Sequence, residues 1–407
     1  MISARLHSLA QQATRYSQRL TSFAEMMGPQ RDLKLSLPSS LFAVTDCTLD
    51  IFAQRLTRYG HHFRRGVVAQ FSEEQSIVSH GGRLSLPPSR SGGLGHVHFA
   101  GSMLSQPVQI CVASPERATT RILCIGDSLS WQGTLSVLSA RLQQSGIEPQ
   151  FIGTYSDIGG VPCEARSSWQ SANFTGQLGG VNSDGSGRTY PIDADHGDGR
   201  IGTSEAYLRL SVAPAVYGPR WAYNPFIRAA TPHDDPTITR GGYVFDLVEY
   251  LDRFGFDAPN IVFIALGTND VRNWARHVST PQALDSLDII HRQTRRALPH
   301  AKIAFVLNGF GNSMLWARMY PLVDAMLARY SGAEMQGTYV LPAYLAVDPK
   351  EGYRSTEVDA RQHAAHPEFK VDDTHMGEIG RRQWADMLYA FVVNHLAKEA
   401  ILTPEIV

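Results

Sequence analysis

The chain has 407 residues, of which 43% are hydrophobic and 18% are charged, and its formal net charge is −1. A chain of this length can bury a large core and favours more than one domain. The balanced charge gives no electrostatic footprint for nucleic acid, and no apolar run reaches the length of a transmembrane helix. We therefore expect neither nucleic-acid binding nor membrane insertion.

The four cysteines, Cys47, Cys111, Cys124 and Cys163, are scattered along the chain without a CxxC pair. They predict neither a disulfide framework nor a zinc site. The first residues, MISARLHSLAQQATRYSQRL, are polar and rich in arginine, so they lack the apolar region of a signal peptide. We expect synthesis in the cytoplasm, with association with a virion or export by a non-classical route left open.

Residues 1–30 have the pattern of an amphipathic, coiled-coil-like helix. Apolar side chains recur there at alternating spacings of four and three and stop before Gly28-Pro29: Ile2, Leu6, Leu9, Ala13, Tyr16, Leu20, Phe23 and Met27. A sustained heptad pattern of this kind predicts that helices from several chains associate. We expect a homo-oligomer, a trimer or a dimer, formed through residues 2–27. The alternative is a single helix that packs on its own chain.

Residues 31–118 are typical of a small β-sandwich-like accessory domain. Leu33, Leu35 and Leu37 alternate with polar residues, as do Leu49 and Ile51, and the segment 84–102 is rich in Gly, Pro and Ser. This pattern predicts strands joined by turns. Residues 113–121 are expected to form a linker to the next domain.

Residues 119–401 alternate between short apolar runs and longer amphipathic segments. We expect strands over 122–125, 150–155, 260–266, 302–308 and 337–345, and helices over 131–144, 243–255, 281–299 and 377–399. Such alternation predicts an α/β fold in which a parallel sheet lies between two layers of helices. Residues 156–240 are expected to form a Gly-rich loop region. The spacing of Asp193, Asp195 and Asp198 in it does not fit a calcium-binding loop, which favours a solvated loop.

The apolar run 122–125 ends abruptly in Gly126-Asp127-Ser128. Ser128 therefore falls between the carboxyl end of a strand and the amino end of a helix. Ligands and reacting groups gather at this edge in open α/β sheets. Taken alone, Asp127 and Ser128 are equally well explained as caps of the helix that follows.

A second strand, 260–266, runs into Gly267-Thr268-Asn269-Asp270. The side-chain amide of Asn269 can donate a hydrogen bond to a developing oxyanion. Its alternative role is that of a turn former. Near the C-terminus, Asp372 and His375 lie three residues apart, on what we expect to be one turn at the start of the last helix. A carboxylate so placed can hold Nδ1 of the imidazole and leave Nε2 to take a proton from a serine.

GDSL at 126–129, GTND at 267–270 and DDTH at 372–375 resemble blocks I, III and V of the SGNH (GDSL) hydrolase family, over about residues 120–400. The resemblance implies that Ser128 is the nucleophile, His375 the base and Asp372 its orienting acid. It also implies an oxyanion hole made by the backbone N–H of Ser128, the side chain of Asn269 and a block II backbone N–H.

The best match to block II is the segment from Glu164 to Trp169, in which Ala165 stands where the family has glycine. Alanine keeps the backbone N–H, but its methyl group narrows the space for the acyl group or requires a positive φ. Supporting roles in the other blocks fall to Gly126, Asp127 and Gly267.

The blocks predict a serine esterase and imply no metal or organic cofactor. The resemblance to family members with an accessory β-domain implies that the enzyme removes small acyl groups, above all O-acetyl groups, from carbohydrate or polysaccharide. A β-rich segment before such a domain also resembles bacterial and phage-associated members, phage tail proteins among them. Two alternatives stay open: a non-enzymatic oligomeric protein that binds or attaches to glycans, and a lipase or thioesterase. Four aromatic residues near the expected site either stack on sugar rings or belong to the core: Trp131, Trp169, Tyr223 and Phe226.

Overall fold

The computed structural model describes residues 35–58, 67–70, 76–78, 82–86, 92–99, 105–176, 189–191, 208–210, 221, 224–272 and 279–401. The expected helix over residues 2–27 lies outside these ranges, as do Tyr223 and the aspartates Asp193, Asp195 and Asp198.

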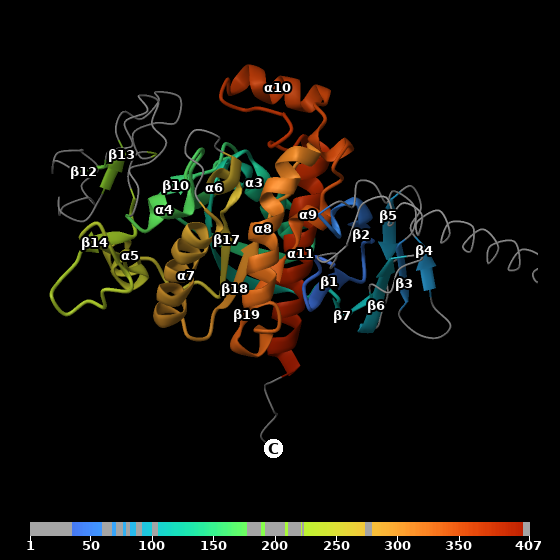
Figure 1. Ribbon diagram of the computed structural model, residues 1–407, viewed down its shortest axis with the longest axis horizontal. Coiled ribbons are helices and arrows are strands. Elements are labelled where there is room, and N and C mark those ends of the chain that lie inside the picture. The colour runs from blue at the N-terminus through green and yellow to red at the C-terminus, as the bar shows by residue number, and fades with distance from the viewer. Residues whose placement is uncertain are drawn as a thin grey trace, which may run out of the picture.

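The centre of the molecule is a parallel sheet (Figure 1). Its strands are β8 (Ala118–Gly126), β9 (Ile147–Ile152), β11 (Pro162–Ala165), β17 (Ile261–Ala265), β18 (Lys302–Val306) and β19 (Thr338–Leu341), with the short β10 (Tyr155–Ser156) antiparallel on the edge. The order is β10-β11-β8-β17-β18-β19, and β9 pairs with the first half of β8 on the same side as β11. The expected parallel sheet is confirmed.

The chain changes direction across the sheet between β8 and β17. From β8 it moves outward to β9 and β11, then crosses back to β17 on the other side of β8 and continues to β18 and β19. The carboxyl ends of the two strands meet, because Gly126 lies opposite Ala265. A crevice at such a switch point is where open α/β sheets bind their ligands. The segments that leave it carry Ser128 and Asn269.

Each face of the sheet is covered by helices, so the three-layer architecture is confirmed. Successive β8 residues alternate between two apolar clusters, Ile122 and Cys124 in one and Leu123 and Ile125 in the other. The first cluster includes α3 (Thr134–Gln144) and α11 (Glu378–Ile401). The second includes α5 (Leu247–Phe254), α7 (Thr280–Ala297) and α8 (Ser313–Tyr330).

The N-terminal strands form a second, separate sheet beside this body (Figure 1). It contains β1 (Ser40–Val44), β7 (Ser105–Ala113), β6 (Gly93–Phe99), β3 (Val67–Gln70) and β4 (Ser76–Val78), in the order β1-β7-β6-β3-β4, with only the β1–β7 pair parallel among those pairs. Another pair, β2 (Leu49–Phe52) and β5 (Arg83–Leu86), is antiparallel. The segment is β-rich as expected, while its description as a sandwich stays a prediction.

The β-rich segment is docked firmly on the α/β body. The ring of Phe42 lies 5.1 Å from that of Phe391 on α11. The Tyr344 hydroxyl donates to the carbonyl of Ser36 at 2.8 Å, and the Trp316 indole N–H donates to the carbonyl of Thr57 at 3.1 Å. The apolar core is thus continuous across the expected boundary between residues 118 and 119, and the division into domains at that point stays a prediction.

Several expected elements differ from the structure at their ends. The helix expected over 131–144 is split into α2 (Ser128–Trp131) and α3, because Gly133 between them adopts a φ of 83°. The segment 243–255 begins as strand β16 (Tyr243–Phe245) before Asp246 caps α5. The strand expected over 337–345 ends at Leu341 and continues as α9 (Ala343–Ala346).

Two expectations about irregular segments were wrong in part. Most of the expected linker 113–121 is ordered, since β7 ends at Ala113 and β8 begins at Ala118. The strand expected from the alternation at Leu35 and Leu37 is not present in the described part of the chain, where both side chains are buried but precede β1. The expected loop region 156–240 also holds short elements: β11, α4 (Ser171–Phe174), β12 (Thr189–Pro191), β13 (Leu208–Leu210), β14 (Ile227–Ala229) and β15 (Thr239–Arg240).

Two helices, α8 and α10 (Glu357–Ala365), were not expected from the sequence. Pro321 lies inside α8, where proline ordinarily disfavours a helix. Packing of its buried face, which includes Trp316, Met319 and Val323, outweighs that penalty. The remaining helical elements are α6 (Thr268–Arg272), η1 (Ala53–Arg55), η6 (Glu334–Gln336) and η7 (Glu351–Tyr353). No helix in the described ranges combines the length and apolar composition needed to cross a bilayer.

Candidate active site

Ser128 is the first residue of α2 and follows β8 after a single capping residue, Asp127. The Asp127 carboxylate accepts a hydrogen bond from the Leu129 N–H at 2.9 Å. Gly126 is needed for this tight exit from the strand, because a Cβ there would lie 2.6 Å from Oγ of Ser130. The side chain of Ser128 is thereby held at the carboxyl edge of the sheet.

The helix that begins at Ser128 has only four residues. It ends there because Gly133, with a φ of 83°, interrupts the helix before α3 begins.

Ser128, His375 and Asp372 form a continuous chain of hydrogen bonds. Oγ of Ser128 lies 3.0 Å from Nε2 of His375, and Nδ1 of His375 lies 2.9 Å from Oδ1 of Asp372. Since an ionised carboxylate only accepts hydrogen bonds, Nδ1 carries the proton in neutral His375. Nε2 is then the acceptor for the serine hydroxyl. This is the arrangement that a serine nucleophile and its base require.

The bend that contains Asp372 stabilises the ionised form of its carboxylate. Its Oδ1 also accepts hydrogen bonds from the backbone N–H groups of Thr374 and His375, both at 2.8 Å. Partial burial by itself raises the pKa of this carboxyl, but the His375 side chain and these N–H groups outweigh burial and hold the pKa well below its usual range. The residues 372–375 form a bend rather than the expected first helical turn, because α11 starts only at Glu378.

The bend is anchored to the connection that follows β18. The N–H of Gly311 donates to the carbonyl of Asp373 at 2.8 Å, and the amide of Asn312 donates to the Asp373 carboxylate at 3.2 Å. Asn312 also caps α8. These bonds thus fix the bend with Asp372 and His375 to the segment that leaves β18.

Asn269 lies in α6, directly after β17, and only 7% of its surface is exposed. Its Nδ2 donates to the backbone carbonyl of Trp169 at 2.9 Å, and the backbone carbonyl of Asn269 accepts from the Gln170 side chain at 3.1 Å. An amide nitrogen carries two hydrogens, and the bond to Trp169 uses one of them. The role of Asn269 as an oxyanion donor stays a prediction.

Asp270, the last residue of the GTND motif, has a structural role. The buried carboxylate of Asp270 accepts from the backbone N–H of Ser171 at 3.1 Å and from its hydroxyl at 2.6 Å. Burial raises the pKa of Asp270, and the contacts with Ser171 oppose that rise. Asp270 and Asn269 therefore fasten the start of α4 to the end of β17. Gly267, at a φ of 108°, makes the turn between β17 and α6.

Ala165 lies inside β11, opposite Gly126 of β8. The next N–H along the chain, that of Arg166, donates to the carbonyl of Gly126 at 2.9 Å. The role of Ala165 as an oxyanion donor stays a prediction.

The segment after β11 contains a buried ion pair that sequence reasoning missed. Arg166 and Glu164 lie 2.6 Å apart, and both side chains are almost wholly inaccessible to solvent. Glu164 also accepts from the Tyr250 hydroxyl at 2.8 Å and from the Thr154 N–H at 2.6 Å. The guanidinium lies 5.1 Å from the Trp169 ring. Removing either partner of this pair would leave a buried, unpaired charge.

Ser168, in the same segment, has a φ of 68° and is the single non-glycine residue with positive φ in the ranges that the structure describes. This conformation is uncommon for a side chain other than Asn, Asp or Gly. It places Trp169, which is 1% exposed, in the core. Trp131 and Phe226 are also buried, at 4% and 0%. These three aromatic residues belong to the core and do not form a platform for sugar rings.

A cation at the site was also missed. The guanidinium of Arg272 lies 3.7 Å from Oδ2 of Asp372. Arg272 follows Asn269 by three residues in α6, the spacing that puts two side chains on one helix face. In the sequence, the spacing of three residues from Asn269 is the one signal that could have pointed to Arg272. In the described part of the chain, no group of three or more His, Cys, Asp and Glu side chains is placed to hold a metal ion.

Neither a comparison with protein-family models nor one with curated proteins finds a match. Solved structures with a similar fold include a family 3 carbohydrate esterase of Clostridium thermocellum, at 13% identity and a TM-score of 0.40, over 69% of this chain and 99% of that one. A family two carbohydrate esterase from Clostridium thermocellum, in complex with cellohexaose, is 13% identical with a TM-score of 0.35, over 86% of this chain and 92% of that one.

A GDSL-like lipase from Parabacteroides merdae, described as putative, is 12% identical with a TM-score of 0.34, over 69% of this chain and 97% of that one. Identities and TM-scores are low, so the roles of residues in this chain have to rest on its own contacts.

Proposed function

We propose that this protein is a serine esterase that hydrolyses small acyl esters, with O-acetyl groups on carbohydrate as its substrate class. The observation that carries the proposal is the hydrogen-bonded chain from Ser128 Oγ to His375 Nε2 at 3.0 Å and from His375 Nδ1 to Asp372 at 2.9 Å. Such a chain activates a hydroxyl that is otherwise a weak nucleophile at neutral pH.

In the first half of the reaction, Ser128 Oγ attacks the ester carbonyl carbon while its proton passes to Nε2 of His375. The resulting oxyanion accepts hydrogen bonds from the Ser128 N–H, the Asn269 amide and the Ala165 N–H. As the tetrahedral intermediate collapses, the C–O bond to the alcohol breaks and the proton on Nε2 goes to the departing oxygen. The acyl group remains as an ester of Ser128.

In the second half, a water molecule attacks the acyl-serine carbonyl and gives its proton to Nε2 of His375. Collapse of the second intermediate releases the carboxylic acid and returns the proton to Ser128 Oγ. Asp372 stays ionised throughout and stabilises the imidazolium that forms at each step. The low pKa of Asp372 supports this role.

The burial of the site supports a small acyl group. Ser128 is 2% exposed, His375 5% and Asn269 7%. A long acyl chain needs an apolar channel beside the nucleophile, whereas an acetyl group needs space for one methyl. The carbohydrate half of the proposal rests on the family resemblance of the motifs. A glycan-binding protein without activity has no use for the Ser128–His375–Asp372 chain, which disfavours that alternative.

The experiment is hydrolysis of p-nitrophenyl acetate by the full chain, compared with the Ser128→Ala and Ser130→Ala variants. Ser130 is a buried serine in the same short helix and is the matched control. Loss of the nucleophile is expected to reduce kcat by several orders of magnitude, while Ser130→Ala keeps most of it. An active Ser128→Ala variant, or an inactive full chain, would overturn the proposal.

Substrate class is tested separately. Release of acetate from acetylated polysaccharides is measured by the wild type and by Ser128→Ala, and a series of p-nitrophenyl esters from acetate to octanoate defines the acyl length. A rate that rises toward octanoate would favour a lipase or thioesterase and count against the acetyl preference.

A further inference from the structure

Arg55, the last residue of η1 in the β-rich segment, reaches across to the connection that follows β18. Its guanidinium donates a hydrogen bond to the backbone carbonyl of Phe310 and lies 5.3 Å from the centre of the Trp316 ring. Only 3% of the residue is exposed. The β-rich segment therefore places a buried cation one residue before Gly311, whose N–H anchors the bend 372–375.

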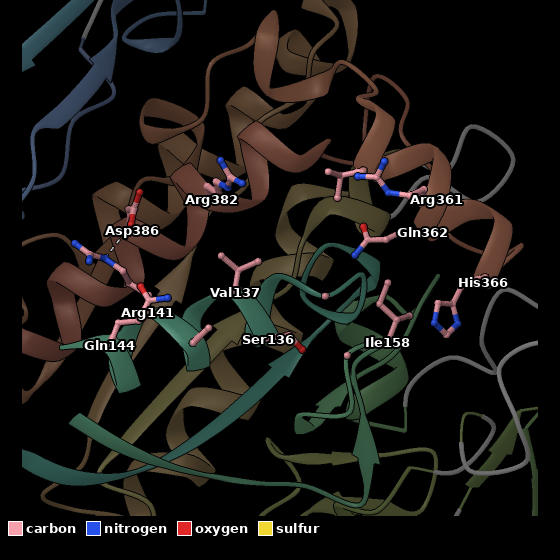
Figure 2. A pocket seen from close by; sticks show the side chains of 15 residues that line it. Ser136, Val137, Arg141, Gln144, Ile158, Arg361, Gln362, His366, Arg382 and Asp386 are labelled. Carbon is pink, nitrogen blue, oxygen red and sulfur yellow. Dashed lines mark ion pairs between the residues drawn. The ribbon is translucent and has the colours of Figure 1, made fainter. Parts of the chain in front are cut away.

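Arg55 differs from the other buried arginines because it has no carboxylate partner. Three arginines in the described part of the chain are buried, and two of them form ion pairs: Arg166 with Glu164 at 2.6 Å and Arg381 with Asp359 at 2.9 Å. The arginines that line a groove of about 700 Å³ formed by α3, α10 and α11 also each have an acid within 4.0 Å (Figure 2). Among the described residues, no acid pairs with Arg55.

The burial of Arg55 has a cost that docking of the β-rich segment does not require. Removal from water lowers the pKa of Arg55 from 12.5 to about 10, and the neighbouring Tyr353 opposes that shift only in part. The side chain is therefore still charged at neutral pH. A buried charge without a counter-charge lowers stability, whereas an apolar side chain of similar length would fill the same space without that cost. The charge therefore indicates a role besides docking.

The hydrogen bond from Arg55 is the first of a series that ends at Asp372. The peptide group 310–311 accepts it through its C=O and donates through its N–H to the C=O of the peptide group 373–374, at 2.8 Å. The N–H of that second peptide group donates to Oδ1 of Asp372, also at 2.8 Å. A guanidinium and a carboxylate are thus joined through two peptide groups, and every donor in the series is directed toward the carboxylate.

The direction of this series is favourable. Each peptide group accepts on the side of the cation and donates on the side of the anion, and hydrogen bonds in such a series polarise and strengthen one another. The Asp372 carboxylate also accepts from Nδ1 of His375 at 2.9 Å, and Nε2 of that ring lies 3.0 Å from Oγ of Ser128. Five hydrogen bonds in series thus connect Arg55 with the nucleophile.

We propose that Arg55 is a positioning residue for the acid–base pair and acts on Asp372 through this series of hydrogen bonds. The proposal rests on the proposed function, in which His375 is the base. The cation fixes the peptide group 310–311, that group fixes the bend 372–375, and the bend sets the position of the imidazole relative to Ser128. The β-rich segment thereby takes part in catalysis, because the first residue of the series belongs to it.

The experiment compares the full chain with Arg55→Met, which removes both the charge and the donor. We expect kcat for p-nitrophenyl acetate to fall by about 10- to 100-fold, because a displacement of about 1 Å at a reacting group costs up to about 100-fold. KM should not change, because Arg55 does not touch the substrate. Deuterium exchange, followed by mass spectrometry, should become faster in the peptides that contain Gly311 and residues 372–375.

Two milder substitutions separate the charge from the hydrogen bond. Arg55→Lys keeps a cation that can donate and should retain most of kcat. Arg55→Gln keeps a donor without a charge, so its kcat should lie between those of the lysine and methionine variants. Equal kcat values for Arg55→Gln and Arg55→Lys would overturn the role given to the charge.

Two control variants separate this effect from general destabilisation. Arg295 also donates to backbone carbonyls, those of Ala301 and Gly337, both at 2.8 Å, but at the opposite edge of the sheet, where β18 and β19 begin. The Tyr344 hydroxyl makes another docking contact with the β-rich segment. Arg295→Met and Tyr344→Phe should keep the wild-type kcat and the wild-type exchange of the bend. Urea unfolding establishes that every variant is folded under the assay conditions.

Hydrogen exchange does not depend on turnover, so it tests the proposal separately from the esterase. Unchanged exchange of the bend in Arg55→Met, or an equal change in the two control variants, would overturn the proposal. An active wild type whose Arg55→Met variant keeps its kcat would overturn it as well. A wild type that hydrolyses no ester, but whose bend exchanges faster in Arg55→Met, would instead refute the esterase alone.

Discussion

Arg272 and Asp372 approach to 3.7 Å from two elements that are far apart in the sequence. Arg272 ends α6, which also carries Asn269, and Asp372 lies in the bend before α11. The positive charge therefore lies next to the carboxylate that faces His375. Both side chains are more than a third exposed, at 37% and 40%, so solvent weakens their interaction. The pair nevertheless joins the end of α6 to the bend that contains Asp372 and His375.

We expect Arg272→Gln to lower kcat/KM for p-nitrophenyl acetate by less than about tenfold, because solvent weakens an ion pair whose two side chains are more than a third exposed. Arg272→Lys keeps the charge and should retain the wild-type kcat/KM, and high salt should reduce the difference between the Gln variant and the wild type. A loss as large as that expected for Asn269→Ala would show that Arg272 does more than pair with Asp372.

We expect Asn269→Ala to lower kcat by about 10²–10³-fold, the usual loss for one oxyanion donor. His375→Ala should instead match the much larger loss of Ser128→Ala, because nucleophile and base act as a unit and their effects do not add. Single-substrate kinetics of the three variants with p-nitrophenyl acetate make the comparison. Activity of Asn269→Ala equal to that of the wild type would leave Asn269 only its bond to the Trp169 carbonyl.

We expect Asp127→Asn to change the pH dependence of stability. Complete burial raises the pKa of the Asp127 carboxyl from 3.8 to about 7. A carboxyl whose pKa is raised by folding stabilises the folded state fully below pH 4, and that contribution is lost as the pH rises toward 7. Asparagine keeps the acceptor for the Leu129 N–H but does not ionise.

The free energy of unfolding of Asp127→Asn, relative to the wild type, should therefore increase between pH 4 and pH 7 and then level off. Urea unfolding at a series of pH values measures it. A difference that is constant across this range would mean that Asp127 does not titrate there.

We expect deletion of residues 1–29 to give a monomer that still hydrolyses p-nitrophenyl acetate. The apolar side chains of the predicted helix over residues 2–27 would be buried only when chains associate, so association should disappear with the helix. The residues of the candidate active site all follow residue 120. Light scattering of the full-length and shortened chains is the measurement, and a full-length monomer would show that the helix does not mediate association.

The sequence by itself determined the elements whose residues interact with near neighbours. Apolar runs at 122–125, 260–266 and 302–308 correspond to β8, β17 and β18, and the segment 281–299 corresponds to α7, which starts with a proline and a capping box. The switch from apolar to polar residues marked both strand ends at the site. Asp372 and His375 also needed no tertiary information, because a spacing of three residues allows their contact within one turn.

Only the tertiary structure decided what joins these pieces. The Tyr250 hydroxyl donates to Glu164 of the buried Glu164–Arg166 pair across 86 residues of sequence. The hydrogen bond from Ser171 to Asp270 likewise joins segments 99 residues apart. The helix α8 persists around Pro321 because Trp316 and its neighbours are buried against the sheet and the β-rich segment. Burial and long-range pairing depend on which surfaces meet in space, and a local pattern carries no information about its distant partner. For that reason the sequence predicted Ser128, His375 and Asp372 as site residues, while only the fold brought Arg272 next to Asp372.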